Sequence, residues 1–182
     1  MDMVANAYYT AEMVKDLPDD GNRYETVHGE LFVTPAPTYR HQEIVIRLVE
    51  PIQTFLKRNN VGHLSISPAN IEWGHDTLVQ PDLFVSVNEE AEKQDWAYIK
   101  TLLLVIEVLS PSSIRRDRIQ KRELYQSRGI PTYWIVNPDD RSIEVWTPED
   151  SAPTVCTETV EWKPEGASEP LTIKLKELFQ GL

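Results

Sequence analysis

Residues 102–125 read LLLVIEVLSPSSIRRDRIQKRELY, and this stretch decides the fold. All residues from Leu102 to Leu109 except Glu107 are apolar, which is typical of a strand buried on both faces. Because an isolated buried carboxylate is costly, we expect Glu107 to be neutral, paired, metal-bound or at the open end of the strand. Alternation predicts two faces, Leu103, Val105, Glu107 and Leu109 on one, and Leu102, Leu104, Ile106 and Val108 on the other.

The basic segment that follows this strand predicts a helix. It begins near Ser112 or Ser113 and ends at Arg128, because Gly129 suits the position after a helix and Pro131 cannot continue one. The core of the chain is therefore a strand that carries one carboxylate and leads into a cationic helix.

Periodicity and turn residues predict the remaining elements. Pro51 falls inside a long helical pattern and costs roughly 3 kcal/mol there, so we expect a kink or break near Glu50. The expected helices are Thr10–Leu17 and Tyr39–Asn59. The expected strands are Tyr24–Val27, Glu30–Thr34, Val61–Glu72 with an irregular middle at Ser67-Pro68-Ala69, Val79–Val87, Thr132–Val136, Ser142–Trp146 and Thr154–Trp162. Asn88–Tyr98 is a surface loop, and Leu171–Leu182 holds a strand or short helix.

Composition indicates one globular domain spanning residues 1–182. The net charge of −11 counts against tight, general DNA binding, although it permits a local basic patch or a metal-dependent site. Cys156 is the only cysteine, which favours a cytoplasmic protein without an intrachain disulfide. Residues 1–6 lack the pattern of a signal peptide, and no apolar run approaches the ~20 residues that cross a membrane.

Asp82 lies in an apolar strand pattern, as Glu107 does. Two carboxylates on adjacent strands can converge on one divalent cation, and magnesium often uses only one or two protein carboxylates together with substrate phosphate. The residues alone favour a solvated pair of carboxylates at the strand ends over a metal site.

These residues also carry a family resemblance. Pro81-Asp82 followed by Glu107-Val108-Leu109 resembles the PD-(D/E)XK nuclease signature, with Leu109 where a lysine is usual. From about Thr10 to the C-terminus, the chain resembles the Uma family, a large bacterial group of restriction-endonuclease-like proteins. The residues that carry this resemblance are Gly29-Glu30-Leu31, Arg40-His41, Gln80-Pro81-Asp82, Glu107-Val108-Leu109-Ser110-Pro111-Ser112, Asp117, Lys121, Tyr125 and Gly129-Ile130-Pro131-Thr132-Tyr133-Trp134.

The resemblance implies an α/β, restriction-endonuclease-like core with a mixed central β-sheet flanked by helices. It also implies an endonuclease that hydrolyses phosphodiester bonds, with Mg²⁺ or Mn²⁺ held by Asp82 and Glu107. Lys121 would replace the missing lysine by reaching in from the following helix. Asp117, Lys121 and Tyr125 share one helix face by their spacing, which permits that role. The alternative is an exposed Asp117–Lys121 ion pair of little energetic consequence.

Further candidates follow from the same resemblance. Glu30 would be an additional catalytic acid, with Glu43 a weaker choice, and His41 would contact substrate or assist proton transfer unless it is structural. Candidates for substrate binding are Gln80, Arg115, Arg116 and Arg118. The alternative for these arginines is a solvated basic helix face.

The expected partners are a nucleic acid, with DNA favoured over RNA, and a second copy of the chain, because cleaving two strands suits a two-fold assembly. No membrane partner is expected. The competing hypothesis is a catalytically inactive restriction-endonuclease-like module that acts through protein–protein interaction, motivated by the acidic balance and by Leu109 in place of lysine.

Overall fold

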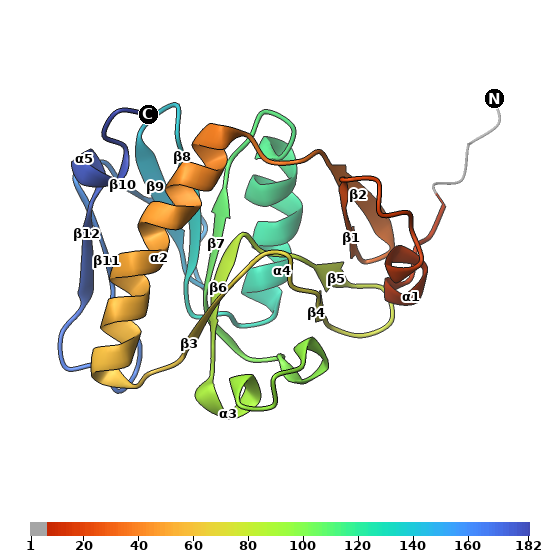
Figure 1. The fold of residues 1–182 in the computed structure, drawn as a ribbon, viewed down its shortest axis with the longest axis horizontal. Coiled ribbons are helices and arrows are strands. Elements are labelled where there is room, and N and C mark those ends of the chain that lie inside the picture. Colours follow the sequence, from red (N-terminus) through yellow and green to blue (C-terminus); the bar gives the residue numbers. More distant parts are fainter. Residues whose placement is uncertain (1–6) are drawn as a thin grey trace.

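A large mixed sheet forms the centre of the computed structural model, which describes residues 7–182 (Figure 1). Residues 1–6, where no signal peptide was predicted, lie outside the described residues. The strand order is β10-β9-β8-β7-β6-β3, with β7 and β8 parallel and every other pair antiparallel. The strands are β3 His63–Ile66, β6 Leu83–Ser86, β7 Leu102–Val108, β8 Tyr133–Asn137, β9 Ser142–Trp146 and β10 Thr154–Cys156.

Two smaller sheets accompany the large one. Four strands pair in the order β2-β1-β5-β4, namely β1 Arg23–Val27, β2 Glu30–Thr34, β4 Ile71–Glu72 and β5 Leu78–Val79. A hairpin near the C-terminus pairs β11 Thr159–Trp162 with β12 Leu171–Lys174. The helical segments are α1 Ala11–Lys15, α2 Tyr39–Asn59, α3 Asn88–Ala91, the 3₁₀ turn Trp96–Tyr98, the π-helical turn Arg116–Lys121, α4 Arg122–Ser127 and α5 Leu175–Leu178.

The large sheet is buried on both faces. On one face it packs against α2, α5 and the β11–β12 hairpin, and on the other against α4 and the four-stranded sheet. Alternate residues of β8 make this division visible, because Trp134 belongs to the first core and Tyr133 to the second. The predicted mixed sheet flanked by helices is confirmed. Within residues 7–182, no helix combines the length and apolarity that crossing a membrane requires.

Strand β7 follows the predicted alternation from Leu104 onward, and its first residues depart from it. Val105 lies in the second core, whereas Leu104 lies in the first. The prediction is wrong for Leu102, which packs in the second core, and for Leu103, which packs against the first. The reason is a register shift, since Ser86 pairs with Leu102 while its neighbour Val85 pairs with Leu104.

Proline interrupts two predicted strand segments, Val79–Val87, where no break was predicted, and Val61–Glu72, where the irregular middle was predicted at Ser67-Pro68-Ala69. Pro81 cannot donate a ladder hydrogen bond, so the chain leaves β5 of the small sheet and starts β6 of the large sheet at Leu83. This break places Asp82 directly before β6. Pro68 similarly separates β3 from β4. Two further ranges also hold two elements each, Thr154–Trp162 with β10 and β11, and Leu171–Leu182 with β12 and α5.

Helix α2 has the predicted bounds and continues through Pro51, so the predicted break is wrong. Buried side chains lie on both sides of the proline, with Leu48 and Ile52 fully shielded from solvent. Their burial holds the helix together despite the hydrogen bond that Pro51 cannot make.

We therefore expect Pro51→Ala to raise the free energy of unfolding by about 1–2 kcal/mol. Alanine restores the missing backbone donor, while the greater freedom of the unfolded chain offsets part of the gain. Urea unfolding of the purified protein measures the change, and Gln53→Ala, at an exposed position of the same helix, is the control. A loss of stability in Pro51→Ala would mean that the proline ring itself makes essential packing contacts.

Candidate active site

Asp82 and Glu107 face each other across two adjacent strands. Leu83 of β6 pairs with Ile106 of β7, so one further step of this antiparallel register sets Asp82 opposite Glu107. Phe84 and Val105, two residues further along, both point into the second core. Both carboxylates therefore project from the same face of the sheet, on the side of α4 and the small sheet.

The carboxylate of Asp82 is almost completely buried and accepts hydrogen bonds at both oxygens. Arg23 Nη1 donates to Oδ1 at 2.8 Å. Oδ2 accepts from the backbone N–H of Val108 at 2.8 Å and lies 3.0 Å from His41 Nε2. Asp82 thus links β1, the start of α2 and the end of β7.

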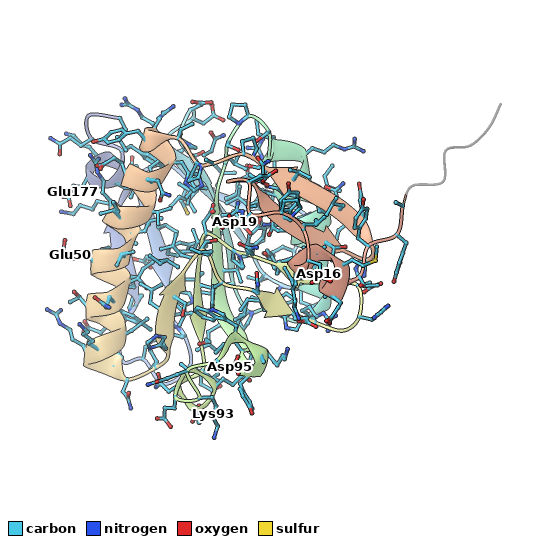
Figure 2. All side chains as sticks on the ribbon, turned by 45° about the vertical axis from the view of Figure 1, so that its right-hand side comes forward. Asp16, Asp19, Glu50, Lys93, Asp95 and Glu177 are labelled. Carbon is cyan, nitrogen blue, oxygen red and sulfur yellow. The ribbon has the colours of Figure 1, made fainter. Side chains whose placement is uncertain are left out.

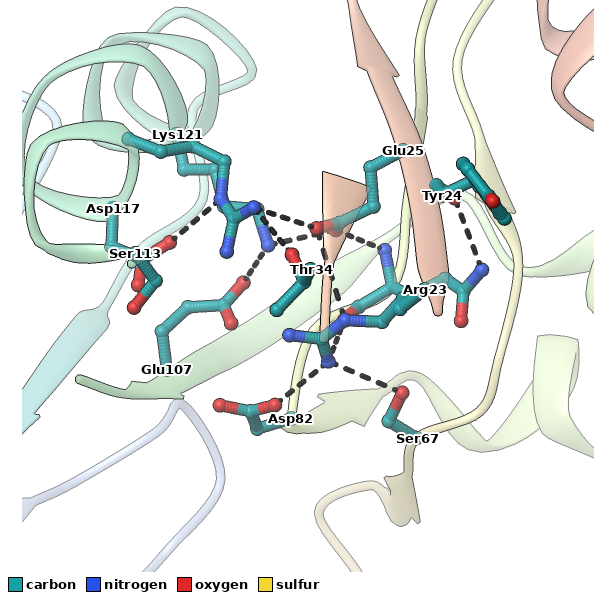
Figure 3. A network of polar contacts seen from close by, with 12 residues as sticks. Arg23, Tyr24, Glu25, Thr34, Ser67, Asp82, Glu107, Ser113, Asp117 and Lys121 are labelled. Atoms are coloured by element: carbon teal, nitrogen blue, oxygen red, sulfur yellow. Dashed lines mark hydrogen bonds and ion pairs between the residues drawn. The ribbon is translucent and has the colours of Figure 1, made fainter. Parts of the chain in front are cut away.

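Glu107 shares a buried lysine with a second glutamate (Figure 3). Lys121 Nζ lies 2.7 Å from Glu107 Oε1 and 2.7 Å from Oε1 of Glu25, and none of the three side chains is more than 1% exposed. Tyr125 also donates its hydroxyl to Glu107 Oε1, at 3.0 Å. Glu25 comes from β1, so the lysine bridges the small sheet and the large one.

The π-helical turn between Arg116 and Lys121 explains how one helix supplies so many inward-facing groups. Its hydrogen bonds span one residue more than those of an α-helix, and such turns occur frequently at functional sites. Arg116, Asp117 and Lys121 are all buried, and Arg116 Nε lies 3.3 Å from Asp117 Oδ1. The predicted helix is confirmed, but residues Arg116–Lys121 form π-helical rather than α-helical hydrogen bonds.

Burial and charge move the pKa values of these carboxyls in opposite directions. Burial, together with the negative charges of Asp82 and Asp117, raises the pKa of Glu107 to about 7 despite the charge of Lys121. Burial also disfavours the charged form of Asp82, but the hydrogen bond from His41 and the charge of Arg23 outweigh it and hold this pKa far below its usual range. Glu107 is therefore the group that titrates near neutral pH.

This shift predicts how stability depends on pH. A raised folded-state pKa stabilises the protein below the unfolded value of 4.5, and that contribution is lost as the pH rises through about 7. Relative to Glu107→Gln, we expect the wild-type protein to lose roughly 2–3 kcal/mol of unfolding free energy between pH 4.5 and pH 8. Urea unfolding in EDTA at several pH values measures this difference. A difference that stays constant with pH would contradict the assignment.

A pocket of about 690 Å³ opens beside this network. Arg23, His41 and Asp82 line it, whereas Glu107, Lys121 and Glu25 lie behind them. Other parts of its wall come from Gln80, Thr34, Val108, Ser110, Ser112 and Ser113. Of the two carboxylates Asp82 and Glu107, Asp82 is the one that a ligand in this pocket can contact directly.

The donor set suits a hard divalent cation. Asp82 and Glu107 offer carboxylate oxygens from one face of the sheet, and buried Glu25 Oε2 has no hydrogen-bond partner among the described residues. Within residues 7–182, no three His, Cys, Asp or Glu side chains are arranged to enclose a metal ion. Asp82 and Glu107 are therefore the two carboxylates that could hold magnesium or manganese, with the remaining ligands coming from water and substrate.

Several predicted candidates lie outside this arrangement. Glu30 is exposed at the turn end of the β1–β2 hairpin, opposite Val27 and away from the Arg23–Thr34 end. Glu43 instead pairs with Arg47 on the surface of α2. The register puts Glu30 on the same face as Glu25, but at the turn end of the hairpin, where nothing covers it, so Glu25 is the acid that reaches the network.

The substrate-binding candidates are divided by the structure. Gln80 lines the pocket, and its backbone N–H donates to Glu25 Oε1 at 2.7 Å. Arg116 is buried beside Asp117, whereas Arg118 pairs with Glu144 and Arg115 is exposed outside the pocket wall. The π-turn explains this division, since it turns Arg116 inward and leaves Arg115 and Arg118 outside. Leu109, at the usual lysine position, packs in the second core.

The sequence patterns did not identify Arg23 and Glu25 as residues of the candidate site. A signal was present, because alternation puts both on the same face of β1 as the buried Val27. Nothing local indicated that this hairpin would pack its face against a helix 90 residues later in the chain, so the pair looked like ordinary strand residues.

Comparisons with known proteins support the architecture. A crystal structure described as that of a "putative nuclease belonging to DUF820" from Anabaena variabilis is similar, with a TM-score of 0.77 and 24% identity over 94% of this chain and 97% of that one. A comparison with curated proteins found no significant match. Residues 11–181 match the profile of the family Uma2, described as "Putative restriction endonuclease". The chain therefore belongs to the Uma2 family, as its sequence motifs predicted.

Proposed function

We propose that this protein is a divalent-metal-dependent endonuclease that hydrolyses phosphodiester bonds in nucleic acid, with DNA the favoured substrate. One observation carries the proposal: two carboxylates, Asp82 and Glu107, face each other on adjacent strands, and Lys121 contacts one of them at 2.7 Å. Membership of a family described as "Putative restriction endonuclease" supports the same chemistry.

Each residue has a distinct part in this proposal. Asp82 and Glu107 would hold Mg²⁺ or Mn²⁺, which supplies polarisation of the phosphate and activation of the attacking water. Lys121 keeps Glu107 oriented and offers a positive charge to the phosphate as negative charge develops there. His41, 3.0 Å from Asp82 at the pocket wall, fixes that carboxylate and is near enough to the pocket to exchange a proton.

The charge distribution bears on how substrate would bind. The acidic side chains labelled in Figure 2 include Asp16, Glu50 and Glu177, all of which are exposed, with Glu50 and Glu177 at one edge of the view. Three cationic side chains of the protein instead point inward, namely Arg23, Arg116 and Lys121. We therefore expect local recognition of phosphate at the pocket, and only weak general attraction to nucleic acid.

Cleavage assays test the proposal. Wild-type protein is incubated with single- and double-stranded DNA and with RNA, in Mg²⁺, in Mn²⁺ or in EDTA, and Asp82→Asn is run beside it. We expect cleavage of at least one substrate class that requires metal and is lost in the variant. Cleavage that persists in Asp82→Asn would reveal a contaminating nuclease or a different site.

A non-catalytic module is the second candidate, and one observation favours it: Asp82 and Glu107 each already have a cationic partner without a metal. Intact nucleic acid in every condition, together with a stable dimer by light scattering, would support this alternative. Dimerisation itself is compatible with both functions, because a two-fold dimer can cut two strands.

A further inference from the structure

Arg23 stands beside the open acceptor position of Asp82. Oδ2 is held by the backbone N–H of Val108 and by His41, whereas Oδ1 accepts only from Arg23 among the described residues and keeps one of its two acceptor positions. A divalent cation at Oδ1 would lie next to the guanidinium, so like-charge repulsion opposes its binding while Arg23 stays in place.

Arg23 is the partner best able to move. The Val108 donor is part of the backbone of the large sheet, and the His41 side chain is fixed at the start of α2 and only 10% exposed. The side chain of Arg23 is long, is 19% exposed and lines the pocket. Its other hydrogen bonds are to the backbone oxygen of Gln80 at 3.0 Å and to the hydroxyl of Ser67 at 3.5 Å.

The guanidinium of Arg23 also stands where a cation is needed. Its Nε lies 3.9 Å from Glu25 Oε2, and Figure 3 shows it between Asp82 and Glu25 with Glu107 across from it. The acids of this network are Glu25, Asp82, Glu107 and Asp117, and its cations are Arg23, Arg116 and Lys121. Arg23 thus supplies the positive charge nearest to Asp82 on the pocket side.

We propose that Arg23 is a displaceable counter-ion, which occupies Asp82 Oδ1 in the metal-free protein and must swing away before a divalent cation binds there. This inference rests on the metal site of the proposed function. The released guanidinium stays within reach of the pocket, where its paired donors suit a phosphate oxygen pair. Metal and phosphate binding would then favour each other, since such coupling is reciprocal.

Removing the counter-ion should tighten metal binding. We expect Arg23→Met to bind Mn²⁺ roughly 10- to 100-fold more tightly than wild type, because no charged hydrogen bond has to be broken first. Electron paramagnetic resonance of free Mn²⁺ gives the dissociation constants without any activity assay. Arg58→Met, which removes the same charge from an exposed site on α2, should leave the constant unchanged.

Thermal unfolding provides a second readout. Without metal, Arg23→Met should melt below wild type, because three buried acids lose a cation, and Mn²⁺ should raise its melting temperature more than that of wild type. Should Arg23→Met fold only when Mn²⁺ is present, that dependence itself supports displacement. Arg23→Lys keeps a charge but loses the paired donors, so its Mn²⁺ affinity should fall between the two.

The outcomes separate this inference from the proposed function. Tighter binding in Arg23→Met that Glu107→Gln abolishes supports both. Equal dissociation constants in Arg23→Met and wild type, again lost with Glu107→Gln, would overturn the role of Arg23 and leave the metal site intact. No saturable Mn²⁺ binding in any variant would overturn the metal site, and the counter-ion role with it.

Discussion

Replacing Asp82 by Asn, or Glu107 by Gln, is expected to lower the rate of metal-dependent phosphodiester cleavage by at least about 10³-fold. Each change keeps the size of the side chain but removes a negatively charged oxygen that the proposed cation needs. Because the two residues serve one cation, the double variant should be little worse than either single one. Single-turnover cleavage of a labelled oligonucleotide measures the three rates.

Asp139→Asn is the matched control, because its side chain is 80% exposed and pairs only with Arg40 in the described structure. We expect it to cleave at the wild-type rate. Circular dichroism checks that Asp82→Asn remains folded, since Asp82 also links Arg23 and His41. A folded Glu107→Gln enzyme that keeps more than a tenth of the wild-type rate would remove Glu107 from the proposed site.

Lys121→Met is expected to be the most damaging single substitution for stability. It leaves Glu25 and Glu107 buried without their shared cation, which should cost about 3–5 kcal/mol of unfolding free energy at neutral pH. We also expect cleavage to fall by roughly 10²–10³-fold, because the charge that faces the developing phosphate negative charge is gone. Urea unfolding and the cleavage assay measure the two effects separately.

A second substitution separates the structural role of the lysine from its catalytic role. Adding Glu107→Gln to Lys121→Met removes one of the two buried charges left without a partner, so we expect part of the stability to return while cleavage does not recover. Lys174→Met, whose side chain is 68% exposed, should change stability by no more than about 0.5 kcal/mol. If Lys121→Met unfolds at the same urea concentration as wild type, the buried bridge contributes far less than its geometry indicates.

Local sequence patterns were sufficient to predict the elements that build the site. The bounds of α2 and of the β1–β2 hairpin followed from periodicity and turn residues, and the family motifs selected Asp82, Glu107 and Lys121 before any geometry was available. The structure brings these three side chains into one network because β6 and β7 are adjacent and the helix after β7 folds back onto the same face.

Tertiary packing decided what could not be predicted. Glu25 and Glu30 lie on the same face of the β1–β2 hairpin, and tertiary packing alone decides that this face is covered at Glu25 and left open at the turn end, where Glu30 lies. The π-turn that buries Arg116 and exposes Arg115 likewise depends on the groups that Arg116 finds inside, including the hydroxyl of Thr34. Polar residues in an inward network resemble surface residues when only the sequence is read.

The most direct test of the metal site is anomalous X-ray diffraction from crystals of the wild-type protein grown with Mn²⁺. The account predicts a manganese peak within about 2.0–2.4 Å of carboxylate oxygens from both Asp82 and Glu107, and a guanidinium of Arg23 that has left Asp82. A peak held by other residues, or none at a Mn²⁺ concentration that supports cleavage, would contradict it.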